Sequence, residues 1–412
     1  MISINTKTGC WTGDCGDPYD SQLRLVAVGD VCPARGREYD EVFTAGPEAI
    51  AAAYGDVIEE LRRKDLSVAN LELALSDRGE PIIKCGPNLI GPPAAIEGVT
   101  FGGFDVMKMA NNHTLDYGQD ALADTIELVR ANGMEVLGQG ADAEDAARPL
   151  IIERQGLRIA MLAFAENEFC NATRTSPGGC PLDPGTNCTA IRRARDGCDL
   201  LIVCVHGGSE LCPIPSPRMM RDYRSFIDAG ADAVIGDHAH TVQGMELHAG
   251  KPIIYNMGNF FFWGDPAAVS PQWWKRIFVR LTFSGRSCTR LDVHPFEVDF
   301  QTAGLRLLTG EKKEAFLGNL NRLSEIIADG DLHERFWNTY CLTRGESYRS
   351  SLAEKAEAII ADQPDKHAAA VLRHFWSCEA HADVIEGYTE LIRLGMEGED
   401  FGVADELDRL MS

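Results

Sequence analysis

Short apolar runs alternate with amphipathic segments along most of the chain. Runs such as LRLVAVG (23–29) and LLIVCV (200–205) are almost entirely apolar, a pattern typical of strands that are buried on both faces. Segments such as PRMMRDYRSFIDAG (217–230) carry apolar residues at helical spacing, with proline at the start and glycine at the end. This alternation predicts an α/β domain in which helices cover the sheets.

The same patterns predict the remaining elements. Further strands are expected at 66–72, 104–110, 157–164, 231–237, 276–283 and 291–300, with a hairpin at 245–258. Helices are expected at 47–64 and 121–133, and after about residue 303 only helical patterns remain, at 311–330, 350–363 and 365–395. We therefore expect an N-terminal extension (1–22), an α/β domain (23–302) and an all-helical C-terminal appendage (303–412).

The composition narrows the class of protein. Hydrophobic residues make up 45% and charged residues 25% of the 412 residues, as in soluble globular proteins. The net charge of −23 disfavours a surface that binds nucleic acid. No apolar run reaches the about 18 residues of a membrane span, and the first residues lack the basic and apolar regions of a signal peptide. We therefore expect a cytoplasmic protein.

The 13 cysteines are scattered and form no CxxC pair, which disfavours a zinc ribbon. Four of them, Cys170, Cys180, Cys188 and Cys212, flank the irregular segment 166–189. One disulfide there is an open option. A long irregular segment in a compact domain is often a functional lid.

Polar residues follow several predicted strands at the point where each strand ends. These residues are Asp30, Glu72, Asn112, His113, His206, His238 and His240. Because ligands of open α/β sheets bind beyond the carboxyl ends of the strands, we expect these side chains to converge. Carboxylates, an amide oxygen and imidazoles suit a divalent first-row metal, and a shared carboxylate allows two ions to act on one water molecule.

Each of these residues also has a plainer interpretation when it is taken alone. Asp30 follows a glycine and is typical of a turn or cap, whereas Glu72 can be a surface carboxylate. His206 follows an apolar run and can be a core histidine, and Asn111 can bond the backbone of its own turn. The joint pattern, rather than any single residue, favours a metal site.

Five segments together resemble the CapA family, the poly-γ-glutamate capsule-synthesis protein family, which has a calcineurin-like metallophosphatase fold. The segments are VGDVCPARG, NLELALS, MANNHTLDYGQDALADTIELVRANGMEVLGQG, HGGSELCPIPSPRMMRDYRSFIDAGADAVIGDHAH and GKPIIYNMGNFFF. The resemblance covers about residues 23–300 and leaves the helical appendage outside. It implies a layered fold of mixed β-sheets flanked by helices.

The resemblance also implies a role for each polar residue. The metal ligands would be Asp30, Glu72, Asn112, His206, His238 and His240, with Glu72 as the bridging carboxylate. The catalytic residues would be His113, Asp30, Asp116, His206 and Asp237, where His113 meets the substrate and Asp116 orients an imidazole. The substrate would be contacted by Asn111, Glu210 and Asn259. The cofactor would be one or two divalent ions, with Mn, Fe, Zn and Ca all open.

Three residues depart from the family pattern. Cys32 stands where the first metallophosphoesterase motif, Asp-x-His, has its histidine, so one metal position has fewer ligands and the number of ions stays open. Gly207 stands where CapA-like sequences often have tryptophan, and Asp237 where they commonly have histidine. We therefore expect an altered substrate wall and an additional acid beside the site.

Three functions remain open from the sequence. The first is a metal-dependent hydrolase of phosphoester or amide bonds, linked to poly-γ-glutamate or capsule metabolism, with metal-activated water and His113 as general acid. The second is a metal-dependent peptide epimerase, as in lasso-peptide (RiPP) biosynthesis, where His/Asp pairs would move a Cα proton. The third is a non-catalytic assembly protein that binds polyglutamate. The expected partners are peptide, γ-glutamyl or phosphoester substrates, and the oligomeric state is not predicted.

Overall fold

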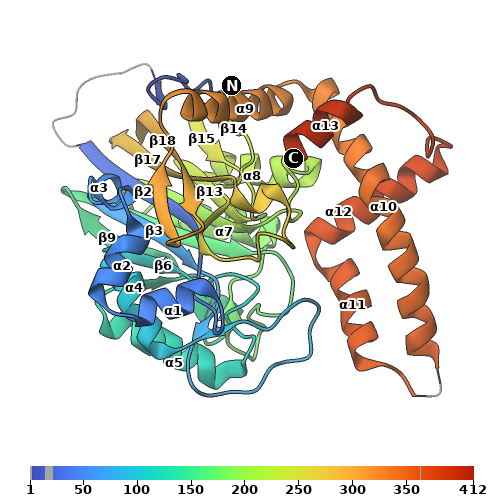
Figure 1. The fold of residues 1–412 in the computed structure, drawn as a ribbon, viewed down its shortest axis with the longest axis horizontal. Coiled ribbons are helices and arrows are strands. Elements are labelled where there is room, and N and C mark those ends of the chain that lie inside the picture. Colours follow the sequence, from blue (N-terminus) through green and yellow to red (C-terminus); the bar gives the residue numbers. More distant parts are fainter. Residues whose placement is uncertain (1, 14–21, 362) are drawn as a thin grey trace.

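The computed structural model of the protein describes residues 2–13, 22–361 and 363–412 (Figure 1). Cys15 and part of the predicted N-terminal extension lie outside the described residues. Two β-sheets are flanked by helices, and a helical region follows at the C-terminal end. The predicted α/β class is therefore confirmed, and so is a helical C-terminal region, although the strand at Gly304–Leu307 lies inside the segment (303–412) that was predicted to be all-helical.

The larger sheet combines parallel and antiparallel strands. Within the described ranges it consists, in spatial order, of β1 (Cys10–Thr12), β18 (Ser287–Asp299), β17 (Arg276–Ser284), β2 (Gln22–Cys32), β3 (Leu66–Leu71), β6 (Val106–Lys108) and β7 (Glu135–Leu137), with β16 (Asn259–Phe262) beside β2 and β19 (Gly304–Leu307) beside β18. The strands β2, β3, β6 and β7 run parallel. The antiparallel part comes from β17 and β18, at the positions predicted for the last two strands.

The smaller sheet contributes the other half of the core. Its order is β14 (Met245–His248), β15 (Lys251–Ile254), β13 (Ala233–His238), β12 (Leu200–Gly207), β10 (Leu157–Ala165) and β9 (Leu150–Arg154). The strands β10, β12, β13 and β15 are parallel, and β14 and β15 form the predicted hairpin. Two short pairs complete the strands: β4 (Ala74–Leu75) with β5 (Ile90–Gly91), and β8 (Gln139–Gly140) with β11 (Gly178–Gly179).

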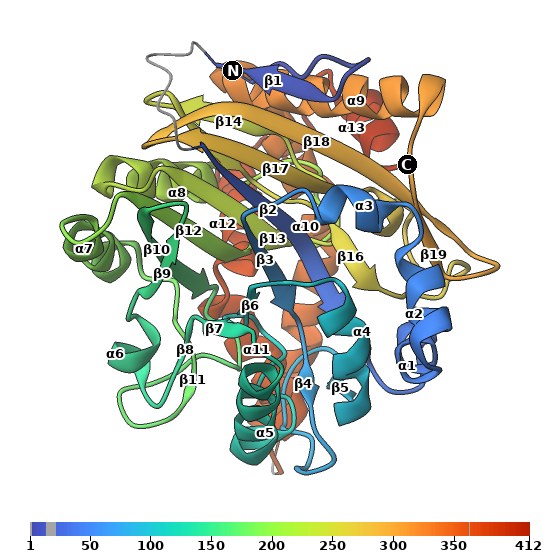
Figure 2. The ribbon, with the colours of Figure 1, turned by 90° about the vertical axis from the view of Figure 1, so that its left-hand side faces the viewer.

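Hydrophobic side chains fill the spaces between four layers. The inner faces of both sheets pack against each other through residues such as Leu25, Val106, Ile202 and Ile235. The outer face of the larger sheet packs on α1 (Glu38–Thr44), α2 (Pro47–Tyr54), α3 (Val57–Leu61), α4 (Ile96–Phe101) and α5 (Gly118–Ala131). The outer face of the smaller sheet packs on α6 (Ala143–Ala146), α7 (Pro184–Arg195) and α8 (Pro217–Ala229) (Figure 2). Such layering lets both sheet faces bury their apolar side chains.

Local predictions differ from the structure in several places, among them the helical segment predicted at 365–395, which Cys378 divides into α11 (Lys366–Ser377) and α12 (Glu379–Arg393). The single helix predicted at 47–64 is divided into α2 and α3 by Gly55, which has a φ of 52°. A Cβ atom at Gly55 would lie 2.1 Å from the carbonyl oxygen of Leu305, so glycine permits this close approach of β19. The segment 166–189 is also less irregular than expected, because α7 begins at Pro184 and the side chain of Asp183 caps it.

The cysteines of the described ranges are free, so the optional disulfide around 166–189 is absent there. Cys170, for example, is buried and its thiol donates to the carbonyl oxygen of Asn112. Buried cysteine of this kind packs as a small apolar residue.

The helical region consists of α9 (Gly310–Ala328), α10 (Gly330–Ile360), α11 (Lys366–Ser377), α12 (Glu379–Arg393) and α13 (Ala404–Met411). The first of these helices, α9, belongs to the layered core, since Leu317 and Leu320 pack between the sheets. Helices α10 to α12 stand beside the sheets (Figure 1), and their own core includes Phe336 and Val384. No helix among the described residues is long and apolar enough to span a bilayer.

Candidate metal centre

The candidate site lies where parallel strands of both sheets end. The larger sheet supplies Asp30 in β2, Glu72 directly after β3 and Asn112 in the loop after β6. The smaller sheet supplies His206 in β12, His238 in β13 and His240 in the loop that follows. All six side chains are buried. We call them the strand-end cluster; the predicted convergence of these residues follows from the shared direction of the strands.

Donor atoms of this cluster are close enough to share metal ions. Three overlapping groups have their donor atoms within 4.8 Å of one another: Glu72, His206 and His238; Asp30, Glu72 and His240; and Asp30, His206 and Asp237. Glu72 belongs to the first two groups. Its Oε1 atom lies 3.7 Å from Nε2 of His206 and 3.8 Å from Nε2 of His240. This carboxylate oxygen therefore lies between two sets of imidazole ligands.

Two carboxylate oxygens of the cluster receive no hydrogen bond from the described residues. They are Oε1 of Glu72 and Oδ2 of Asp30, both buried, with Oδ2 lying 3.3 Å from Nδ1 of His240. Burial and the nearby negative charge of Asp30 raise the pKa of Glu72 well above its usual range. Buried carboxylates without donors are unfavourable, and a divalent cation would compensate both charges. The oxygen and imidazole donors suit first-row metals, so the residues fit a divalent ion.

His206 is oriented by groups on its far side. Its Nδ1 atom lies 2.7 Å from Oδ1 of Asp237, and the ammonium group of Lys108 contacts the same oxygen. Its Nε2 atom lies 3.0 Å from Oδ1 of Asn112 and 3.0 Å from Nδ1 of His238. A carboxylate behind a metal-binding imidazole fixes the tautomer and raises ligand basicity. Lys108 was missed by the sequence analysis, although a lysine inside the apolar run FDVMKMA is itself a signal.

His113 lies beside the strand-end cluster and is held by a buried ion pair. Its Nδ1 atom lies 2.6 Å from Oδ2 of Asp116, and Nζ of Lys84 donates to Oδ1 of Asp116 over 2.6 Å. Burial and the charge of Lys84 lower the pKa of His113. Lys84 was also missed, because it lies in a loop with no pattern around it. Asp116 thus contacts the imidazole of His113, and its role in orienting that ring stays a prediction.

The three predicted substrate-binding residues lie in different surroundings. Asn111 is buried, and its amide group donates to Oδ1 of Asn70 over 3.0 Å. Asn259 is also buried, with its Oδ1 2.9 Å from Nδ1 of His240. Glu210 is exposed and lines a cavity beside the cluster. A role for any of the three in substrate binding stays a prediction.

The backbone at His238 and His240 has an unusual conformation. His238 has a φ of 99° and His240 a φ of 53°, values that non-glycine residues rarely adopt. Such conformations persist where the surrounding structure enforces them, and they gather at functional sites. With this backbone conformation both imidazoles point toward Glu72, since donor atoms of each lie within 4.8 Å of that carboxylate.

A cavity of about 230 Å³ opens beside the cluster and has walls from two regions of the chain. The layered domain contributes Lys84, Asn112, His113, Glu168, Glu210 and His238. The helical region contributes Tyr340, Arg344, Tyr348, His374, Cys378 and His381. The helical region is therefore one wall of the candidate site, which the sequence analysis did not foresee.

Gly207 and Cys32, two residues that depart from the family pattern, have distinct surroundings in the structure. A Cβ atom at Gly207 would lie 2.7 Å from Cγ of Glu166, so a carboxylate side chain packs directly on this glycine. Glu166 in turn accepts a hydrogen bond from the backbone of Ala380 in α12 and pairs with Arg218. Cys32 is buried, and burial raises the pKa of its thiol well above its usual value. Within the described ranges Cys32 belongs to none of the potential ligand groups.

Comparisons with known proteins identify relatives of this chain. Residues 24–263 match the family described as Bacterial capsule synthesis protein PGA_cap. The capsule biosynthesis protein CapA of Bacillus anthracis is 29% identical over 254 residues, which cover 59% of this chain and 60% of that protein. The PGA biosynthesis protein CapA of Bacillus subtilis (strain 168) is 28% identical over 239 residues, covering 56% and 61%. The chain thus matches about three fifths of the length of these relatives.

Solved structures show weaker similarity. The 5′-nucleotidase precursor from Thermus thermophilus aligns with 74% of this chain and 59% of that chain, at 14% identity and a TM-score of 0.38. The 5′-nucleotidase from Candida albicans aligns with 73% and 56%, at 8% identity and a TM-score of 0.38. These scores carry no conclusion about function. The family match, by contrast, covers more than half of the chain and contains the whole strand-end cluster. The chain belongs to the bacterial capsule synthesis protein PGA_cap family.

Proposed function

We propose that the chain is a metal-dependent hydrolase that cleaves a phosphoester or γ-glutamyl amide bond in an anionic substrate. The observation that carries the proposal is the buried Oε1 atom of Glu72, which has no hydrogen bond among the described residues and lies between two imidazoles. Two divalent ions would be held, with Glu72 shared between them. Asn112, His206 and His238 would complete one position, and Asp30 and His240 the other. When bound, such ions polarise the scissile bond and activate water.

His113 is the residue proposed to move a proton during the reaction. Its Nδ1 atom is taken by Asp116, so Nε2 is the nitrogen that can exchange a proton with the leaving group. Lys84 fixes Asp116 from the other side and also donates to the carbonyl oxygen of Asn112, over 3.1 Å. The buried ion pair thereby holds the imidazole and the neighbouring ligand loop in one geometry.

The substrate class rests on the cavity and on the relatives. The cavity contains the cationic groups of Lys84 and Arg344, of which Arg344 is exposed and can pair with a carboxylate or phosphate. A volume of about 230 Å³ admits a small group or the end of a chain rather than a bulky ligand. The names of the relatives, capsule biosynthesis and PGA biosynthesis, support a γ-glutamyl substrate.

The test measures the metal content of the purified chain and its turnover of two classes of probe substrate. The purified full chain, loaded with manganese or zinc, should hydrolyse an aryl phosphate or a γ-glutamyl anilide. His113→Ala should lower kcat by about 10²- to 10⁴-fold, the usual contribution of a positioned acid or base, while the metal content is kept. His248→Ala is the matched control, because His248 is paired with Asp228 at the surface.

Bound metal without turnover of either probe, or turnover that His113→Ala leaves intact, would contradict the hydrolase. Deuterium uptake at a peptide Cα without hydrolysis would identify an epimerase instead. Binding of a polyglutamate chain without any turnover would identify an assembly protein.

A further inference from the structure

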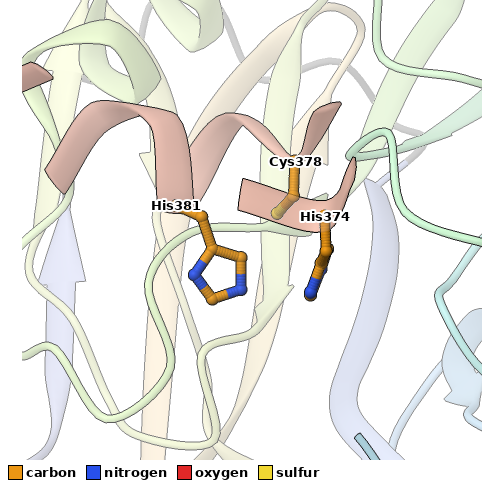
Figure 3. Close-up of side chains that lie close together, drawn as sticks. All are labelled: His374, Cys378 and His381. Carbon is orange, nitrogen blue, oxygen red and sulfur yellow. The ribbon is translucent and has the colours of Figure 1, made fainter. Parts of the chain in front are cut away.

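Three side chains of the helical region gather at the junction of α11 and α12. His374 lies near the end of α11, Cys378 at the bend between the helices and His381 in the first turn of α12 (Figure 3). Their donor atoms lie within 4.8 Å of one another. We call these residues the helix cluster. All three lie outside the residues that match the family.

The local fold explains why these three residues meet. Cys378 follows His374 by four residues, about one helical turn, and His381 comes three residues later in the next helix. The backbone bends at Cys378, which has a ψ of 123°. The rings of His374 and His381 then face each other with centroids 4.3 Å apart and planes inclined by 72°. The cluster is therefore compact without any contribution from distant strands.

His374 is a buried side chain whose ring nitrogens lack hydrogen bonds. The residue is 6% exposed, and neither nitrogen makes a hydrogen bond of acceptable geometry with the described residues. The carboxylate of Glu168 is nevertheless near, with Oε2 3.1 Å from Nε2. A carboxylate on one nitrogen of an imidazole, with the other nitrogen unused, is the arrangement found around metal-binding histidines.

The second histidine has a comparable partner. Nδ1 of His381 is hydrogen-bonded to the hydroxyl group of Tyr348, which leaves Nε2 as the nitrogen for a ligand. Burial and the charge of His374 lower the pKa of His381 to about 4, whereas, despite burial, Cys85 and Glu168 raise the pKa of His374 to about 9, so His374 has to release a proton when a metal binds. Neutral imidazole is the form that binds metals.

We propose that His374, Cys378 and His381 bind a zinc-class divalent ion, in a site separate from the strand-end cluster. Two imidazoles and one thiolate are preferred ligands of Zn²⁺, and three protein ligands leave a fourth position open. All three residues line the same cavity as His113 and His238, so the open position faces the substrate space. An anionic group of the substrate is the ligand class that this position would take. The site does not depend on the hydrolase proposal.

Glu168 connects the two clusters. Its Oε2 atom lies 3.1 Å from His374, and its Oε1 atom lies 3.8 Å from Nε2 of His238 in the strand-end cluster. Although burial acts in the opposite direction, both histidines lower the pKa of Glu168. One carboxylate thus lies between the imidazoles of the two clusters.

The plainer alternative is a helix junction whose thiol is only a hydrogen-bond donor. Sγ of Cys378 lies 3.6 Å from Oε2 of Glu166, and burial together with the charge of Glu166 raises the pKa of this thiol. Zinc binding would require the thiol to lose its proton to solvent, as a coordinating thiol does. A signal that is specific for thiolate should appear if Cys378 binds the metal and should be absent if its thiol only donates a hydrogen bond.

The experiment is a Co²⁺ titration of the full metal-depleted chain, followed by absorption spectroscopy and elemental analysis. A thiolate ligand produces a sulfur-to-cobalt charge-transfer band. We expect the band in the wild type and in Cys341→Ser, a buried cysteine of α10 that serves as matched control. Cys378→Ser should abolish the band and lower the metal content by one ion per chain. His113→Ala should leave the band unchanged, which separates this test from the hydrolase test.

A second variant covers the case in which Cys378→Ser fails to fold. Tyr348→Phe keeps all three ligands and removes the hydroxyl group on His381, so it should weaken Co²⁺ binding about 10- to 100-fold. Cobalt binding without a charge-transfer band in the wild type would overturn the proposal. So would a band that survives Cys378→Ser, or one that Cys32→Ser abolishes, because the thiolate would then belong to the strand-end cluster.

Discussion

The strand-end cluster and the helix cluster lie on one cavity but are built in different ways. The strand-end cluster draws its ligands from residues 30 to 240, and the two sheets bring them together. The helix cluster takes its three side chains from residues 374 to 381, and two consecutive helices bring them together. Oxygen and imidazole donors make up the first set, and a thiol occurs in the second. The comparison indicates a candidate metal site that depends on the global fold and a cavity wall whose geometry is encoded locally.

The docking of the helical region depends on one buried network. Arg218 of α8 pairs with Glu166 over 2.6 Å and with Asp383 of α12 over 2.9 Å. Glu166 also packs against Gly207, at the end of the strand that carries His206. A single carboxylate therefore links the wall of the cavity to the strand-end ligands. Changes in this network should disturb the wall first and the strand-end cluster second.

The largest expected effect comes from Glu72→Gln. The change removes the charge that both ligand groups share. Metal content at the strand ends and kcat/KM should therefore fall by at least about 100-fold, which is the upper limit for residues that only hydrogen-bond to a metal ligand. The thiolate–cobalt band of the helix cluster should remain. Glu153→Gln, on the exposed side of β9, is the control and should behave as wild type. Retention of full activity in Glu72→Gln would remove the basis for a shared carboxylate.

Arg218→Met should produce the next largest effect, in the helical region. The arginine side chain is 15% exposed, and its loss leaves Glu166 and Asp383 as buried charges without their partner. Removal of one partner from a buried ion pair destabilises by about 3 to 5 kcal/mol. Hydrogen exchange should therefore accelerate in α11 and α12 while the amides of β2 and β3 stay protected.

Arg221→Met is the matched control for this variant, because Arg221 lies in the same helix with its side chain 72% exposed. Exposed ion pairs contribute little, so its exchange pattern should equal that of the wild type. Equal acceleration in β2 and α12 of the Arg218 variant would show that the two regions unfold as one unit.

Gly207→Ala should have a smaller effect of the same kind. The added methyl group would lie 2.7 Å from Cγ of Glu166 and would displace the carboxylate from Arg218 and Ala380. Overpacking of a buried position usually costs about 1 to 3 kcal/mol, measurable by urea denaturation. Gly318→Ala in α9 is the control, since a Cβ atom there meets no neighbour within 4 Å. If Gly207→Ala were as stable as the wild type, Glu166 could not be the rigid link described above.

The sequence predicted the strand-end cluster better than the wall. Asp30, Glu72 and His206 were found because each follows an apolar run, and parallel strands place such positions at one edge. The helix cluster was missed although its three residues are close in sequence, since His374 and His381 fit an ordinary amphipathic helix. The groups that surround them, Glu168 and Tyr348, come from distant segments. Gly55 was placed inside one helix for the same reason, because its contact with Leu305 is tertiary. Local patterns identify elements and their ends, whereas contacts between distant elements need the fold.

The smallest expected effect is a decrease in the free energy of unfolding at acid pH, which arises in the sheets. His294 of β18 is partly buried and stacks on Phe278 with ring centroids 4.5 Å apart. Burial and the charge of Arg280 lower the pKa of His294 to about 4, whereas an unfolded histidine has a pKa of about 6.5. As pH falls through this window, the unfolded chain binds the proton and the folded chain does not, so the free energy of unfolding decreases.

His294→Phe keeps the stacking and removes the titrating group. It should reduce the loss of stability between about pH 7 and pH 5 by about 1 kcal/mol. This is less than the full linkage value, because solvent reaches part of the ring. His248→Gln, a surface histidine, should leave the loss unchanged. The aromatic ring that His294 stacks on, Phe278, belongs to the same sheet. Hydrogen exchange in α11 and α12 should therefore not respond to the substitution. An equal response in those helices would mean that the wall and the sheets share one cooperative unit, contrary to the local construction inferred for the helix cluster.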